Sequence, residues 1–187
     1  MRILIYALPR TGSNNLTHYI ANSLHYKEII EPYNEQRFWD KDITEFDIWE
    51  RDNVVVKMII GQGDYWYEDI KLKFDKVVVL YRENIKEQAE SYAYAANSID
   101  WHMPYIYNPS NISEEEYKKA YTKIGSRVDE LKSINAFQIS YENLYLSGTD
   151  RDRLDEYIGI TNKSFRFILD SNNKYRRDNT GIKKTLI

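Results

Sequence analysis

The residues best suited to chemistry stand in a short polar stretch near the start of the chain. Arg10 brings a planar guanidinium, which can hold a phosphate or a sulfate through two parallel hydrogen bonds. An apolar strand pattern precedes this stretch and a helical pattern follows it, so a helix dipole and several backbone N–H groups point at one place. Such a place favours an anion. We therefore predict an anion-binding loop made of Pro9, Arg10, Thr11, Gly12, Ser13, Asn14 and Asn15.

This loop differs from other phosphate-binding loops. A nucleotide-hydrolysing P-loop requires G-x-x-x-x-G-K-[ST], and a dinucleotide fingerprint requires G-x-G-x-x-G. Here Arg10 precedes a lone Gly12, and no lysine follows directly. Magnesium-dependent phosphoryl transfer also needs a carboxylate on an apolar strand of the sheet, where it holds the metal ion. The two most apolar runs of this chain carry Lys57 and Arg82 instead. The pattern predicts a cationic site without a metal, in which Arg10 and Arg82 hold two separated anionic groups.

Alternating strands and helices must position these residues. The β-branched runs at 53–60 and 76–81 are typical of strands that are buried on both faces of a parallel sheet. The alternation predicts an α/β chain with a three-layer P-loop-like fold, whose central, mainly parallel sheet is flanked by helices. Ligands of such sheets bind at the carboxyl ends of the strands. We therefore expect the Arg10 loop, Glu31, Lys57 and Arg82 to lie along one edge.

Capping and turn residues set the other expected elements. Asn84 with Glu87, and Ser113 with Glu116, have the spacing of a capping box, which opens a helix. Pro32 ends a short strand, and Gly159 ends a helix. The remaining predictions are a strand at 27–31, a loop at 33–51 with one helical turn near 43–49, helices at 66–74, 84–96 and 113–133, a loop at 97–111, a strand at 137–140, and a helix opened by Thr149 with Asp152.

Composition limits the kind of protein. The chain has 187 residues, which suits a single domain over 1–187. A net charge of −3 argues against a general nucleic-acid partner, and the absence of cysteine removes disulfides, thiolate catalysis and cysteine-bound zinc. No stretch matches a signal peptide or a membrane span, so we expect a soluble cytoplasmic protein. The sequence leaves its oligomeric state open.

Two motifs resemble a known family. The stretch L-P-R-T-G-S-N-N-L at 8–16 and the stretch L-Y-R-E-N-I-K-E-Q-A-E-S-Y-A-Y-A at 80–95 are similar to the two nucleotide-binding motifs of sulfotransferases that use 3′-phosphoadenosine 5′-phosphosulfate (PAPS). The spelling R-E-N-x-x-x-Q-A-x-S is closest to the carbohydrate and bacterial branches. S-Y-E-N-L at 140–144 resembles the family's Tyr-Glu-Asp-Leu segment, with Asn143 in place of the Asp. The helix pattern at 154–160 also fits, so the resemblance reaches from the start of the chain to about Ile160.

The resemblance implies roles for the donor-binding residues. Arg10 with the loop 11–15 would bind the 5′-phosphosulfate, Arg82 with Ser91 the 3′-phosphate, and Tyr141 would lie near the adenine. The basic tail at 175–181 is similar to a segment that closes over the 3′-phosphate in cytosolic sulfotransferases, although its spacing differs, and a frayed terminus is the other reading. These roles make PAPS the co-substrate and require no metal.

The acceptor side is less defined. The acceptor hydroxyl needs a base within about 3 Å, and Glu31 resembles the Glu that serves as base in carbohydrate sulfotransferases, with His102 as the alternative. Lys57 would stabilise the bridging oxygen as charge moves to the leaving phosphate. The acceptor is expected to be a sugar or glycan hydroxyl, or a small molecule, and the aromatic stretch 101–107 suits a sugar ring. Two other functions remain open, a divergent P-loop-like kinase and a non-catalytic nucleotide-binding or assembly protein.

Overall fold

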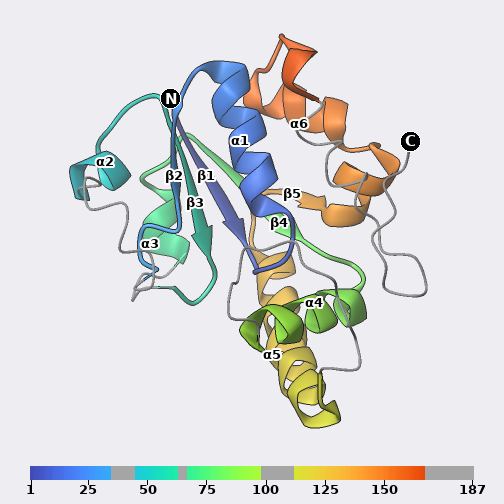
Figure 1. Cartoon of the computed structure of the whole chain (residues 1–187). Coiled ribbons are helices and arrows are strands. Elements are labelled where there is room, and N and C mark those ends of the chain that lie inside the picture. Colours follow the sequence, from blue (N-terminus) through green and yellow to red (C-terminus); the bar gives the residue numbers. More distant parts are fainter. Residues whose placement is uncertain (35–44, 63–66, 98–111, 167–187) are drawn as a thin grey trace.

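A five-stranded parallel sheet lies between helices in the part of the chain that the structure describes (Figure 1). The computed structural model describes residues 1–34, 45–62, 67–97 and 112–166. All four strand pairs run parallel, in the order β2-β3-β1-β4-β5. This confirms the predicted α/β class with its central parallel sheet. The strands are β1 (Arg2–Ala7), β2 (Lys27–Ile30), β3 (Val54–Ile59), β4 (Lys76–Tyr81) and β5 (Phe137–Ser140).

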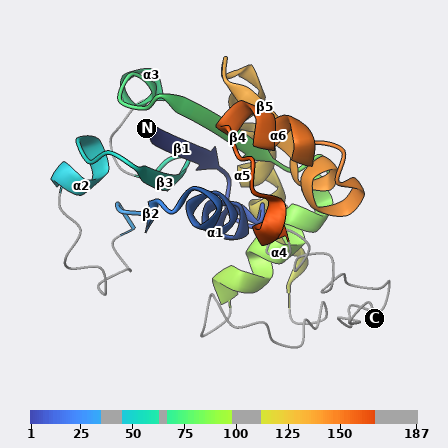
Figure 2. The same ribbon diagram turned by 90° about the horizontal axis from the view of Figure 1, so that it is seen from above.

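Helices cover both faces of the sheet. Successive residues of a strand point to opposite faces, so Ile3 and Ile5 pack beneath one helical layer, while Leu4 and Tyr6 pack beneath the other. Seen from above, α1 and α3 lie on opposite sides of the sheet (Figure 2). The first layer contains α1 (Ser13–Leu24), the π-helix η2 (Glu142–Ser147), α6 (Arg151–Ile158) and the short η3 (Lys163–Phe165). The second contains α2 (Glu45–Trp49), α3 (Tyr67–Lys71) and α5 (Glu114–Ser133), and α4 (Ile85–Asn97) packs against α5.

The strand order places a topological switch at β1. β1 pairs with β3 on one side and with β4 on the other. The connections on the two sides of β1 therefore run in opposite directions away from its carboxyl end. In an open α/β sheet, ligands usually bind at such a point. The Arg10 loop starts there.

One helix start differs from the sequence prediction, and one predicted capping box forms only in part. α6 begins at Arg151, after Asp150, and not at a Thr149 cap, because the Thr149 hydroxyl is paired with the Ser147 hydroxyl at 2.9 Å. The predicted Ser113 capping box is present in full. At α4 only half of the box forms: the Asn84 side chain accepts from the Glu87 N–H at 3.2 Å, but the Glu87 carboxylate turns elsewhere.

Some predicted features cannot be placed. His102, the aromatic stretch 101–107 and the basic tail at 175–181 lie outside the described residues. Within the ranges that the structure describes, no helix is both long enough and apolar enough to cross a lipid bilayer.

Candidate functional site

The loop after β1 turns sharply into α1. Arg10 has φ 65° and Gly12 has φ 77°, so two of three consecutive residues are left-handed. For a non-glycine residue such as Arg10 this conformation costs about 1–2 kcal/mol. The buried Thr11 hydroxyl donates to the Leu8 carbonyl at 2.8 Å and closes the turn. No side chain caps the start of α1. The backbone N–H groups of a helix start are suited to binding an anion.

Two buried side chains support this loop from other elements. Gln88 of α4 donates from Nε2 to the Pro9 carbonyl at 2.8 Å. The Tyr145 hydroxyl, on η2, donates to the Gly12 carbonyl at 2.6 Å. Both residues are fully buried, and burial raises the pKa of Tyr145 well above its ordinary value, which keeps the phenol a donor. The loop therefore has its carbonyls tied down from two directions.

Four of the predicted site residues come together beside the loop. Arg82, at the end of β4, donates from Nη1 to the Arg10 carbonyl at 3.5 Å. The Arg10 side chain donates from Nε to the Ser91 hydroxyl at 3.0 Å. The Arg82 guanidinium lies over the Tyr141 ring, 4.2 Å from its centroid. Ser91 thus contacts Arg10 directly, and the two arginines form one cluster at neighbouring strand ends.

Carboxylates also approach Arg82. Its Nη2 is 2.7 Å from Glu87 Oε2, and its Nε is 3.9 Å from Glu142 Oε1. Glu142 accepts two backbone N–H groups as well, from Glu83 at 2.9 Å and Asn84 at 3.1 Å. Among the described residues, the buried Nε of Arg82 has no hydrogen-bond partner. A largely buried cation is therefore flanked by two acids and keeps unused donor capacity.

A second centre lies at the ends of β2 and β3. Lys57 is buried and forms an ion pair with Glu31, which has φ 51° just after β2. Gln62 Nε2 donates to Glu31 Oε2 at 3.1 Å, and Asn34 Nδ2 donates to the same oxygen at 2.9 Å. Burial acts to raise the pKa of Glu31, but the Lys57 charge and these hydrogen bonds outweigh it and lower the pKa to about 2. Glu31 is thus ionised at neutral pH.

The two centres share one edge of the sheet. Glu31 N donates to the Lys57 carbonyl at 2.8 Å, and Lys57 pairs in register with Ile5 of β1. Neighbouring strands are about 4.8 Å apart, so β2 is about 10 Å from β1. Lys57 sits inside β3, two residues before its end, and reaches the edge through its side chain. Within the described ranges, no group of three or more acidic or histidine side chains is arranged to hold a metal ion.

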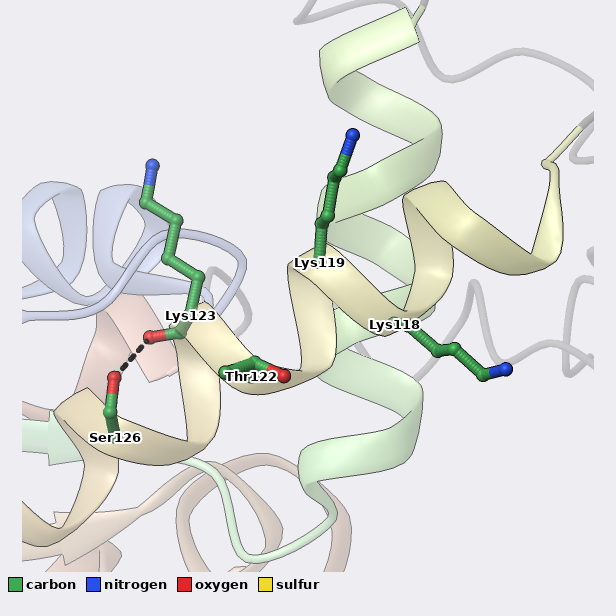
Figure 3. Close-up of a pocket in the computed structure, with 5 residues that line it drawn as sticks. All are labelled: Lys118, Lys119, Thr122, Lys123 and Ser126. Carbon is green, nitrogen blue, oxygen red and sulfur yellow. Dashed lines mark hydrogen bonds between the residues drawn. The ribbon is translucent and has the colours of Figure 1, made fainter.

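A shallow pocket on α5 is unrelated to this edge. Lys118, Lys119 and Lys123 are among its lining residues, and Lys118 points away from the other two (Figure 3). Lys118 and Lys119 are ion-paired with the glutamates one turn before them, and Lys123 donates to the Tyr92 hydroxyl at 2.8 Å. Because each lysine already has a partner, we do not assign an anion site here.

Sequence reasoning missed several members of the site. Gln88 stands inside the second motif, so its position carried a usable signal. Tyr145, Gln62 and Asn34 have no such signal, because their contacts depend on the turn of η2 and on the loops after β2 and β3. Glu142 lies in the S-Y-E-N-L segment, but the resemblance implies no role for it.

Comparison with known proteins gives a structural likeness. No family model matches the sequence, and no curated protein matches it. The structure resembles the crystal structure of mouse sulfotransferase SULT7A1 complexed with PAP, with a TM-score of 0.51 and 14% sequence identity. The match covers 98% of this chain and 69% of that chain. At this identity the likeness establishes a shared fold, and the carbohydrate or bacterial branch stays a prediction.

Proposed function

We propose that this chain is a sulfotransferase that moves a sulfuryl group from PAPS to an acceptor hydroxyl. One observation carries the proposal: Arg10, Arg82, Ser91 and Tyr141, which come from three separate segments of the chain, meet beside the carboxyl ends of β1 and β4. The fold shared with a PAP-complexed sulfotransferase supports the same function. PAP here is 3′-phosphoadenosine 5′-phosphate, the product that PAPS leaves behind.

The donor would bind along the arginine cluster. Arg10 and the loop residues 11–15, with the start of α1, suit the 5′-phosphosulfate, because a fixed guanidinium and backbone N–H groups meet there. Arg82 suits the 3′-phosphate, since its guanidinium is a largely buried charge next to the Arg10 loop. Tyr141 lies against Arg82, which would place its ring near the adenine. Ser91 would link the 5′-phosphosulfate side of the site to the 3′-phosphate side through its hydrogen bond with Arg10.

The reaction breaks the bond between sulfur and the oxygen of the 5′-phosphate and forms one between sulfur and the acceptor oxygen. PAP leaves, and the acceptor proton passes to a base. Glu31 is our candidate, because it is ionised, and Lys57 would stabilise the bridging oxygen as negative charge grows there. While Lys57 holds Glu31, the low pKa makes the carboxylate a weak base. If Lys57 moves toward the departing oxygen, Glu31 loses the neighbouring charge that lowers its pKa, and the carboxylate becomes a stronger base. His102 is the alternative base.

The acceptor is proposed to be a carbohydrate hydroxyl. The spelling of the second motif and the position of Glu31 after β2 support this class. The aromatic stretch 101–107 would supply a stacking surface for a sugar ring. A small-molecule hydroxyl would meet the same chemistry at the same edge.

Donor binding is tested by calorimetric titration with PAP and with ATP plus magnesium. We expect PAP to bind and Arg82→Ala to weaken it about 10- to 100-fold, as the loss of a charge-assisted contact predicts. Arg153→Ala is the control, because Arg153 is an exposed arginine of α6. Failure of PAP to bind, or an unchanged affinity in Arg82→Ala, overturns the sulfotransferase function, and tighter binding of magnesium ATP favours a kinase.

Turnover tests the base. With PAPS and a panel of sugar acceptors, Glu31→Gln should lower the rate about 100-fold or more and leave PAP affinity nearly unchanged. Full turnover in this variant assigns the base elsewhere. Absence of turnover with every acceptor, together with tight PAP binding, points instead to a nucleotide-binding protein.

A further inference from the structure

The two carboxylates beside Arg82 are anchored very differently. Glu142 accepts hydrogen bonds from the backbone N–H groups of Glu83 and Asn84, and its side chain is 23% exposed. The Glu87 side chain is 60% exposed, and Arg82 is the cation that holds it, at 2.7 Å. Glu142 is therefore part of the framework, whereas Glu87 can rotate into water at little cost.

The position of Glu87 follows from the incomplete capping box at α4. In a complete box the Glu87 carboxylate would accept the backbone N–H of Asn84. Here Glu142 accepts that N–H at 3.1 Å, so Glu87 is displaced from the helix end. Its carboxylate accepts a hydrogen bond from Nη2 of Arg82 instead. Glu87 thereby occupies a donor of Arg82 that an anionic ligand could also use.

We propose that Glu87 is an internal competitor for the 3′-phosphate of the nucleotide. The inference rests on the proposed function, in which Arg82 binds that phosphate. The Glu87 carboxylate imitates one phosphate oxygen, and nucleotide binding requires it to leave Arg82 and turn toward solvent. An acid at this position lowers the affinity for both PAPS and PAP. It therefore also speeds the release of PAP after transfer.

The test compares two charge-matched variants by calorimetry. Glu87→Gln removes the competing charge, and Glu83→Gln removes a charge one turn away whose carboxylate is paired with Lys132 at 2.9 Å. Each protein is titrated with PAP and with adenosine 5′-phosphate, which lacks the 3′-phosphate. We expect Glu87→Gln to bind PAP about three- to tenfold more tightly. Glu83→Gln should match the unmodified chain, and adenosine 5′-phosphate should bind all three proteins alike.

The outcomes separate this inference from the function beneath it. If PAP binds the unmodified chain and Glu87→Gln binds it equally or more weakly, the competitor role is wrong while the donor site stands. A gain that appears equally with adenosine 5′-phosphate also overturns the role, since the effect would not belong to the 3′-phosphate. If no protein binds PAP, the proposed function and this inference fail together. Slower PAP dissociation from Glu87→Gln in stopped flow supports it independently.

Discussion

Glu31 and Lys57 form a buried pair in which each charge depends on the other. The Lys57 side chain is 3% exposed, and the Glu31 side chain 13%. Removing one partner of such a pair leaves an uncompensated charge and typically costs about 3–5 kcal/mol. The pair sits at the proposed reaction centre, so its electrostatics bear on stability and on catalysis together.

The pH dependence of stability provides a test of this pair. The pKa of Glu31 lies at about 2, below its ordinary value of 4.5. Because the folded pKa is the lower one, the stabilisation is present above about pH 4.5 and is lost as pH falls toward 2. We expect urea titrations to show a loss of about 3 kcal/mol from this group over that interval. The loss should be absent in Glu31→Gln.

Glu156→Gln is the matched control, because Glu156 is exposed on α6. It should retain the steep acid dependence of the unmodified chain. An equally steep dependence in Glu31→Gln would mean that other carboxylates cause the acid loss, and that the Glu31–Lys57 pair is weaker in solution than its geometry indicates.

At the scale of elements, the anion loop depends on helices that come much later in the chain. η2 supplies Tyr145 and α4 supplies Gln88, and both hold carbonyls of the loop. The loop sequence alone does not fix its shape, because Arg10 takes a left-handed conformation that surrounding contacts must stabilise.

Tyr145→Phe tests this support. Losing the hydrogen bond to the Gly12 carbonyl should lower stability by about 1–2 kcal/mol and weaken PAP binding severalfold, because the loop amides lose their fixed direction. Tyr157→Phe is the control: the Tyr157 hydroxyl bonds the backbone of Val77, at the start of β4, far from the loop. It should lower the melting temperature and leave PAP affinity unchanged. Equal PAP affinity in both variants would show that η2 does not position the loop.

The sequence predicted elements better than their junctions. The β-branched runs located β3 and β4 to within a residue, because burial on both faces leaves a continuous apolar signal. The capping box located the start of α5. The half-formed box at α4 was not predictable, since the competing acceptor, Glu142, is more than fifty residues away in the chain. The partners of Glu31 likewise come from separate loops that meet only after folding.

At the scale of the whole molecule, nucleotide binding should stabilise the fold. The proposed donor site joins the ends of β1 and β4 to α1, α4 and the start of η2. A ligand at one hundred times its dissociation constant adds about 2.7 kcal/mol. For a chain of 187 residues this corresponds to a rise of roughly 5–10 °C in melting temperature.

Differential scanning fluorimetry with PAP measures that rise directly. ATP with magnesium at the same concentration should give a smaller shift, because it lacks a 3′-phosphate for Arg82. Arg82→Ala should abolish most of the PAP shift, whereas Arg153→Ala should keep it. A shift of equal size with both nucleotides would contradict the assignment of Arg82 to the 3′-phosphate.

Because β1 lies at the centre of the sheet, it stays unpaired during synthesis until later strands have been made. β1 precedes both of its partner strands in the chain: Arg2 pairs with Val54 and Ile3 with Lys76. At about 5–20 residues per second, the ribosome needs roughly 3–10 s after β1 to deliver its first partner strand. An apolar strand thus waits without its neighbours on the nascent chain, where chaperones and aggregation compete for it. The central position that makes β1 the support of the anion loop therefore also leaves it unpaired for several seconds while the protein is being made.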